Sequence, residues 1–140
     1  MTEKWDKRFL ALAEHIAEWS KDPSTCVGAV IVDEKRRIAS TGYNGFPRGV
    51  KDLEERYLDR SKKYPRVVHA EANAILTSRG SVENCTLYTS LLTCCECAKL
   101  VIQSGIKRVV APNAFDGKWW ESNQIAMEMY EEAGVEVTLV

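Results

Sequence analysis

The sequence has 140 residues, 45% of them hydrophobic and 28% charged, which is typical of one globular domain with a substantial core. Nineteen lysine and arginine residues against 20 aspartate and glutamate residues give a net charge of −1, which argues against nucleic-acid binding through bulk electrostatics. No apolar run approaches membrane-spanning length and the charged N-terminus lacks a signal-peptide core, so we expect a single domain over residues 1–140 in the cytoplasm (the host cytoplasm for a viral source) with no membrane partner.

The N-terminal third of the chain predicts one helix followed by two strands. Apolar residues recur at steps of three and four along residues 3–20, which predicts an amphipathic helix. The apolar, β-branched run over residues 26–32 predicts a strand, and a charged turn leads to a second strand near residues 38–41. Residues 42–49 contain three glycines and a proline, so we expect a loop there.

The rest of the chain alternates between helices and strands. The highly charged residues 50–65 predict a surface segment with a short helix. Three helices, each followed by a strand, are then predicted at 70–79 and 86–90, at 94–104 and 108–111, and at 122–133 and 135–140. This alternation favours an α/β fold with a largely parallel sheet covered on both faces. Ligands bind such sheets at the carboxyl ends of the strands.

Two short motifs provide metal ligands and a free carboxylate. His69-Ala-Glu71 is followed by Cys94-x-x-Cys97, and a zinc ion held by one histidine and two thiolates keeps a fourth position open, which is typical of catalytic zinc. Cys94 and Cys97 share a helix face, whereas Cys95 points about 100° away. This combination belongs to the zinc-dependent nucleobase deaminases, in which the glutamate is the general acid and base. We therefore predict His69, Cys94 and Cys97 as zinc ligands and Glu71 as the catalytic residue.

The other cysteines and the second histidine favour packing over metal binding. Cys26 and Cys85 lie in apolar, strand-like runs and are expected to be small buried residues. His15 flanks the apolar stripe of the first predicted helix, so we expect it to pack there. A closed structural zinc site would need a fourth protein ligand, and the sequence offers no clear candidate. The cysteine content fits a reducing compartment better than a disulfide framework.

Four segments carry a family resemblance. Residues 21–29 (KDPSTCVGA), 42–49 (GYNGFPRG), 69–75 (HAEANAI) and 94–99 (CCECAK) resemble deoxycytidylate deaminases, and the resemblance covers almost the whole chain. It implies a three-layer α/β/α sandwich with a five-stranded mixed sheet, the cytidine deaminase-like fold. It also implies zinc-dependent hydrolysis of dCMP to dUMP and ammonia, which supplies dUMP for thymidylate synthesis.

The resemblance also suggests where the substrate binds. Asn44 resembles the asparagine that holds the sugar 3′-hydroxyl, although an asparagine that only tolerates a left-handed turn would look the same. Lys21, Ser24 and Thr25 lie where a 5′-phosphate could be held by a cation and hydroxyls, but such residues are common at the ends of helices and strands. The adjacent tryptophans Trp119 and Trp120 could cover the base or pack at a subunit contact, and Trp120 is the candidate substrate residue.

One position departs from the family pattern. A proline usually precedes the first cysteine of the Cys-x-x-Cys motif, and here the residue is Thr93. The sequence from Thr93 to Glu96 is typical of a capping box, in which the threonine hydroxyl accepts from the N–H of Glu96 and the glutamate reaches back. We therefore expect Thr93 to begin the helix that carries the cysteines.

Regulation and subunit number are implied by the resemblance alone. Many deoxycytidylate deaminases are homohexamers that dCTP activates with Mg²⁺ and dTTP inhibits, so Tyr43, Gly45 and Arg48 are candidate effector residues. An ordinary surface loop with a solvated arginine is the alternative. Two other functions stay open: another zinc-dependent deaminase, acting on nucleosides or tRNA adenosine, and a non-catalytic zinc-binding interaction module.

Overall fold

The computed structural model describes residues 2–114 and 117–140, and its centre is one mixed β-sheet. The five strands are β1 (Gly28–Val32), β2 (Ile38–Tyr43), β3 (Thr86–Thr89), β4 (Arg108–Ala111) and β5 (Glu136–Leu139). They lie in the order β2-β1-β3-β4-β5. β1 runs antiparallel to both of its neighbours, whereas β3, β4 and β5 are parallel to one another. The N-terminal hairpin therefore makes the sheet mixed rather than largely parallel.

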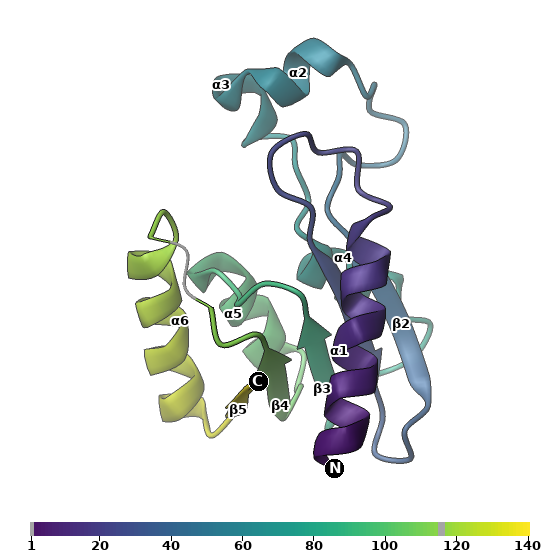
Figure 1. Ribbon diagram of the computed structural model, residues 1–140, viewed down its shortest axis with the longest axis vertical. Coiled ribbons are helices and arrows are strands. Elements are labelled where there is room, and N and C mark those ends of the chain that lie inside the picture. Colours follow the sequence, from purple (N-terminus) through teal and green to yellow (C-terminus); the bar gives the residue numbers. More distant parts are fainter. Residues whose placement is uncertain (1, 115–116) are drawn as a thin grey trace.

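Helices cover both faces of the sheet (Figure 1). They are α1 (Glu3–Ala17), α2 (Glu54–Leu58), α3 (Arg60–Lys63), α4 (Ala70–Thr77), α5 (Cys95–Gln103) and α6 (Trp120–Ala133). α1 packs on one face, and α4, α5 and α6 contribute to the core on the other. The predicted three-layer α/β/α sandwich with a five-stranded mixed sheet is confirmed. Within the described parts of the chain, no helix is long and apolar enough to cross a membrane.

β1 lies between β2 and β3 and is buried on both faces, which explains its unbroken apolar sequence. Val30 and Val32 point into the core beneath α1, while Ala29 and Ile31 point into the larger core beneath the other helices. Because side chains alternate along a strand, one apolar run serves both layers.

β2 is longer than the sequence predicted, and α4 lies close to its last residues. The sequence predicted a loop from Gly42 onward, but β2 continues to Tyr43. A Cβ at Gly42 would overlap the backbone of Ala70 and Ala74 in α4, so only glycine lets this helix lie so close to the strand. Gly42 therefore helps to set the position of α4.

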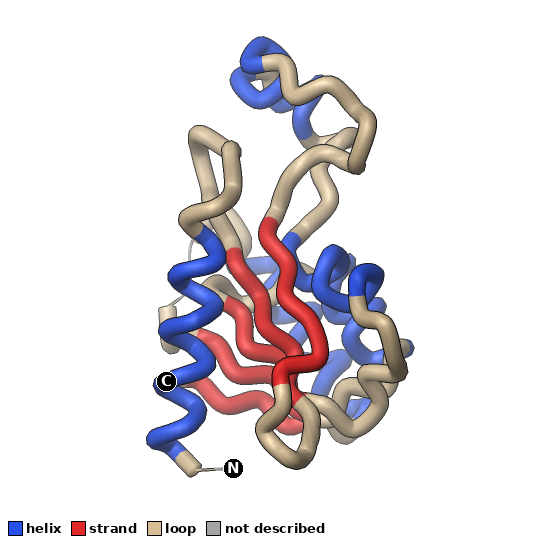
Figure 2. The backbone as a smooth tube through the Cα atoms, turned by 90° about the vertical axis from the view of Figure 1, so that its right-hand side faces the viewer, coloured by secondary structure: helices blue, strands red, loops and turns tan. Residues whose placement is uncertain are grey.

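The charged segment before α4 extends beyond the ends of the strands and carries α2 and α3 (Figures 1 and 2). The prediction of a surface segment with a short helix is confirmed, but two side chains of this segment are buried. Tyr57 stacks on Phe46 with ring centroids 4.0 Å apart. The Lys63 ammonium donates to Asp22 across 3.2 Å, and both side chains are buried.

The cysteine and histidine predictions have mixed outcomes. Cys85 is buried as expected, but Cys26 is exposed, and that prediction was wrong. The reason is that β1 begins only at Gly28, so Cys26 lies in the preceding loop, with its sulfur 3.2 Å from the Asp22 carbonyl oxygen. His15 is exposed; its ring meets the Trp19 ring edge-on at 5.9 Å, and its Nδ1 atom lies 3.3 Å from the Glu18 carboxylate.

A buried ion pair links α1 to β4 on the face that α1 covers. The Asp6 carboxylate accepts from Arg108 at 2.9 and 2.6 Å and from the Tyr88 hydroxyl at 2.8 Å. Burial alone would raise the pKa of Asp6, but the hydrogen bonds from Arg108 and Tyr88 outweigh it and hold the pKa below its ordinary value of 3.8. The pair therefore stabilises the native state while Asp6 is ionised.

We expect Asp6→Asn to lower the free energy of unfolding by roughly 3–5 kcal/mol near neutral pH, because it leaves a buried guanidinium without its carboxylate. The pKa of Asp6 is lower in the folded state, so the pair stabilises the protein above the unfolded-state pKa and is lost as the pH falls through the folded-state pKa. Urea denaturation across the acid range should show a smaller loss of stability in Asp6→Asn than in the unchanged protein. Glu3→Gln, at an exposed carboxylate, is the control. Equal acid dependence in all three proteins would contradict the prediction.

Candidate active site

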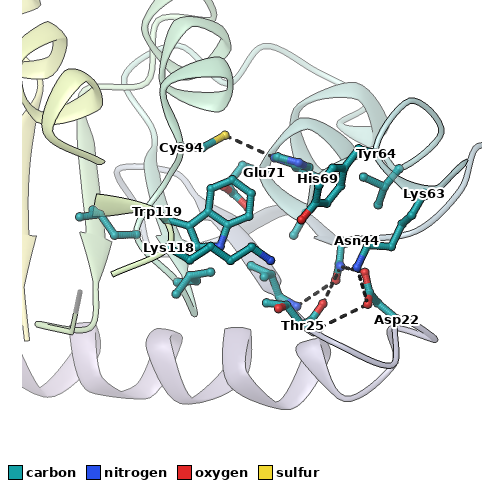
Figure 3. A pocket seen from close by; sticks show the side chains of 15 residues that line it. Asp22, Thr25, Asn44, Lys63, Tyr64, His69, Glu71, Cys94, Lys118 and Trp119 are labelled. Carbon is teal, nitrogen blue, oxygen red and sulfur yellow. Dashed lines mark hydrogen bonds and ion pairs between the residues drawn. The ribbon is translucent and has the colours of Figure 1, made fainter. Parts of the chain in front are cut away.

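A pocket lies at one edge of the sheet, where β2, β3 and β4 end and β1 begins (Figure 3). Its walls come from segments that are far apart in the sequence. Thr25 and Val27 precede β1, Asn44 follows β2, and residues 91–94 follow β3. The loop before α6 and the start of α4 complete the pocket. This is the edge at which the sequence predicted a ligand.

Three potential metal ligands meet at this pocket, and two of them, His69 and Cys94, line it. His69 is the N-cap residue of α4, Cys94 is the N-cap residue of α5, and Cys97 lies one turn further along α5. The His69 Nδ1 atom is 3.4 Å from the Cys94 sulfur and 3.2 Å from the Cys97 sulfur. The three ligand atoms all lie within 4.8 Å of one another. Tetrahedral zinc would separate nitrogen and sulfur ligands by roughly 3.5 Å, so the group fits that ion.

The Cys94 sulfur lies in surroundings that favour its thiolate form. The Cys97 thiol donates to it, His69 contacts it, and the backbone N–H of Cys97 points at it from 3.4 Å. These donors lower the pKa of Cys94. A thiolate at a helix N-terminus is the form that binds metal, which fits Cys94 as a ligand.

Glu71 lies beside the three ligands without being one of them (Figure 3). Its side chain is in the first turn of α4, only 4% exposed, and lines the pocket. Burial raises the pKa of Glu71 to about 7. A carboxyl group with this pKa can both accept and return a proton near neutral pH.

Asn44 is held rigidly in the polar wall. Its side-chain oxygen accepts from the Val27 N–H at 2.9 Å, and its amide nitrogen donates to the Thr25 carbonyl oxygen at 2.9 Å. Among the described non-glycine residues, positive φ angles occur at Arg36 and Asn84, so Asn44 does not adopt the left-handed turn that was its alternative explanation. It is buried yet lines the pocket.

Besides Asp22 and several apolar residues, the pocket is lined by Lys63, Tyr64 and Lys118, which sequence reasoning did not predict, and by Trp119 of the predicted tryptophan pair. The Lys118 ammonium lies 5.8 Å from the centroid of the Tyr64 ring and 5.4 Å from that of the Trp119 ring. A hydrogen bond from Lys118 lowers the pKa of Tyr64. Their positions in the sequence could have indicated these residues. Lys63 and Tyr64 belong to the segment that leads into His69, and Lys118 and Trp119 belong to the loop that follows β4.

The predicted substrate residues divide into two groups. Asn44 and Thr25 line the pocket, as described above. Lys21, Ser24 and Trp120 do not line it. The Lys21 ammonium pairs with Asp52 at 3.1 Å, Ser24 is exposed, and Trp120 is the first residue of α6 with 49% of its surface exposed. Trp119, one residue earlier, occupies the pocket wall instead.

The predicted effector residues lie around the end of β2, and none of them lines the pocket. Tyr43 is 44% exposed and meets the Trp19 ring edge-on, and Arg48 is exposed. Gly45 pairs with Val68 through two backbone hydrogen bonds of 3.1 and 2.8 Å. This bridge fixes the segment leading into His69. An effector role for the three residues stays a prediction.

The predicted capping box at Thr93 is wrong. Cys94, not Thr93, is the N-cap residue of α5, and its sulfur takes the place of the capping oxygen. The Thr93 hydroxyl instead lies 2.6 Å from the Tyr130 hydroxyl, and Glu96 pairs with Lys99 at 2.8 Å. The motif failed because α6 supplies a partner for Thr93 that local sequence does not reveal.

Comparison with known proteins gives consistent results. Residues 3–112 match the family described as the cytidine and deoxycytidylate deaminase zinc-binding region. A protein of Aliivibrio fischeri named "uncharacterized deaminase in luxG 3′region" is 44% identical, over 99% of this chain and 95% of its own length. The deoxycytidylate deaminase of Pongo abelii is 41% identical, over 94% of this chain and 77% of its own.

A solved structure extends the similarity to the whole fold. The crystal structure of dCMP deaminase from cyanophage S-TIM5, in complex with dCMP and dUMP, has a TM-score of 0.82 to this chain. The two sequences are 26% identical, and the match covers 100% of this chain and 99% of the phage protein.

Proposed function

This chain belongs to the cytidine and deoxycytidylate deaminase zinc-binding family, and on that premise we propose that it hydrolyses dCMP to dUMP and ammonia. One observation carries the proposal: a buried carboxyl group, Glu71, adjoins a histidine and two cysteines at the end of a pocket. Relatives named deoxycytidylate deaminases and the phage enzyme with bound dCMP and dUMP support the choice of substrate.

His69, Cys94 and Cys97 would hold the zinc ion. When bound there, zinc supplies a Lewis acid that makes the attacking water more acidic. The donor set fits this role, since it leaves a tetrahedral position for a non-protein ligand. His69 and Cys94 are the N-cap residues of α4 and α5. Packing of these two helices on the sheet therefore brings the ligands together.

Glu71 moves the protons of the reaction. It takes a proton from the attacking water and protonates N3 of the cytosine ring, so that C4 becomes more electrophilic. The oxygen of that water adds to C4, and Glu71 then takes the remaining proton from the new C4 hydroxyl and delivers it to the amino group as the C4–N bond breaks, so that ammonia leaves. One water is consumed and one ammonia released, and the carboxylate returns to its starting state. The raised pKa of Glu71, caused by burial, suits this alternating role.

The pocket walls suggest how the nucleotide lies. Leu92, Ala70 and Trp119 offer apolar surface for the base, and Asn44 offers an amide for the sugar hydroxyl. The 5′-phosphate needs a cation, and we assign this role to Lys118 rather than to Lys21. Lys118 lines the pocket, with its ammonium 5.8 Å from the centroid of the Tyr64 ring, whereas Lys21 does not line it (Figure 3).

Ammonia release from dCMP, CMP, deoxycytidine and dCTP tests the substrate, using zinc-loaded protein. We expect dCMP to have the highest kcat/KM. Lys118→Met should raise KM for dCMP by about 10- to 100-fold, the value of a charge-assisted contact, and leave KM for deoxycytidine unchanged. Lys21→Met is the matched control and should keep the KM for dCMP. A preference for deoxycytidine in the unchanged protein would contradict the proposed substrate, whereas equal effects of both lysine variants would contradict only the assignment of Lys118.

We further propose that the product supplies thymidylate synthesis and that the enzyme is a homohexamer activated by dCTP with Mg²⁺ and inhibited by dTTP. These properties rest on the resemblance to deoxycytidylate deaminases. Tyr43, Gly45 and Arg48 are the candidate effector residues, because a glycine-rich backbone can approach a nucleotide and an exposed guanidinium can bind phosphate.

Initial-rate curves test the regulation. The rate should depend sigmoidally on dCMP alone and become closer to hyperbolic with dCTP and Mg²⁺, because an activator must bind the active assembly more tightly. Arg48→Ala should weaken this change, while Lys51→Ala, at a neighbouring exposed cation, should not. Hyperbolic curves that neither nucleotide alters would contradict the regulatory proposal and leave the deaminase assignment intact.

A further inference from the structure

We propose that α6 positions the metal site, with Asn123 and Tyr130 as positioning residues that fix the turn carrying Cys94. The inference rests on the proposed zinc site. α6 supplies none of the three ligands, yet its polar side chains bond to the residues on both sides of Cys94. These contacts join segments about thirty residues apart in sequence.

Asn123 holds the backbone that enters the turn. Its side-chain nitrogen donates to the Thr93 carbonyl oxygen at 2.9 Å and to the Leu92 carbonyl oxygen at 3.3 Å. The asparagine is only 3% exposed, and Leu92 and Thr93 are buried as well. Ser122 acts on the other side of the cysteine, where its hydroxyl accepts from the Cys95 N–H at 2.8 Å. The peptide groups before and after Cys94 are thus both anchored to the first turn of α6.

Tyr130 fixes the same turn by contacting the side chain of Thr93. Its hydroxyl lies 2.6 Å from the Thr93 hydroxyl, and both residues are fully buried. A buried hydroxyl without a partner is costly, so each group keeps the other in place. Thr93 is therefore fixed by its carbonyl oxygen and by its side chain.

Cys94 needs this support more than Cys97 does. Cys97 lies within α5, where the helix itself fixes the backbone. Cys94 is an N-cap residue with extended backbone angles (φ −75°, ψ 169°), so its direction depends on the irregular segment before it. Residues that orient a metal ligand typically change metal affinity by about 10- to 100-fold when they are replaced.

Zinc affinity measured by competition with a chelator tests the proposal without any need for substrate. We expect Asn123→Leu to weaken zinc binding by about 10- to 100-fold, and Tyr130→Phe to weaken it by a smaller factor in the same direction. Tyr130→Phe removes a single oxygen and keeps the ring, so it serves if Asn123→Leu does not fold. The midpoint of urea denaturation of the zinc-free proteins is measured alongside.

Tyr88→Phe is the matched control. Tyr88 is also a fully buried tyrosine whose hydroxyl has a buried partner, Asp6, but it lies under α1 on the other face of the sheet. It should lower the denaturation midpoint and leave zinc affinity unchanged. Equal zinc affinity in Tyr130→Phe and Tyr88→Phe would overturn the proposal, because the role of Tyr130 would then be structural only. Failure of the unchanged protein to bind zinc would instead overturn the proposed function on which this inference depends.

Discussion

Glu71→Gln should lower kcat for dCMP by about 10²- to 10⁴-fold, the usual effect of removing a positioned proton carrier. The amide has nearly the shape of the carboxyl group, so the buried position beside the ligands remains filled. The amide cannot take up and return a proton, so both protonation of N3 and departure of ammonia should slow. Ammonia release gives kcat, and metal analysis of the same sample should show zinc retained.

The control for this variant is Glu96→Gln. Glu96 lies in the first turn of α5 as Glu71 does in α4, but it is exposed and pairs with Lys99. Its replacement should leave turnover near the unchanged value. Normal turnover in Glu71→Gln would remove this residue from the mechanism, and loss of zinc from it would show that its role is structural.

Cys97→Ala should abolish both stoichiometric zinc and activity. The unchanged protein is expected to hold about one zinc ion per chain, as three-ligand catalytic sites do. Removal of Cys97 would leave one histidine and one thiolate, too few protein ligands for a stable zinc site. Metal analysis after dialysis, together with ammonia release, measures both effects.

Cys95→Ala is the comparison for the ligand variant, because it removes a thiol from the same turn. The side chain of Cys95 is not in the ligand group, and its backbone N–H, which bonds to Ser122, survives the substitution. Zinc should therefore stay bound in Cys95→Ala. Zinc retained by Cys97→Ala and lost from Cys95→Ala would mean that the ligand register is wrong.

The sequence indicated which residues meet at the candidate metal site because they form two pairs of close neighbours along the chain. His69 and Glu71 are two residues apart, and Cys94 and Cys97 are three apart, so short-range geometry largely fixes each pair. The periodic apolar residues likewise predicted the helices and strands, since each element buries one or two faces against the sheet.

Contacts between distant segments could not be predicted in the same way. Tyr130 lies 37 residues beyond Thr93, and the local sequence gives no sign that these two hydroxyls meet. Lys63 carries a charge and was expected at the surface, but its burial depends on Asp22 from another loop. Trp119 lines the pocket and its neighbour Trp120 does not, because α6 begins between them and turns the two rings in different directions.

The division of the molecule by its sheet has a practical consequence for engineering. The ion pair of Asp6 and Arg108 lies on the face covered by α1, whereas α4, α5 and the start of α6 support the candidate zinc ligands from the opposite face. Since well-separated substitutions act nearly additively, heat tolerance and substrate range should be adjustable in independent libraries. Variation around Trp5 and Phe9 would address the first property, and variation of residues 117–119 would address the second.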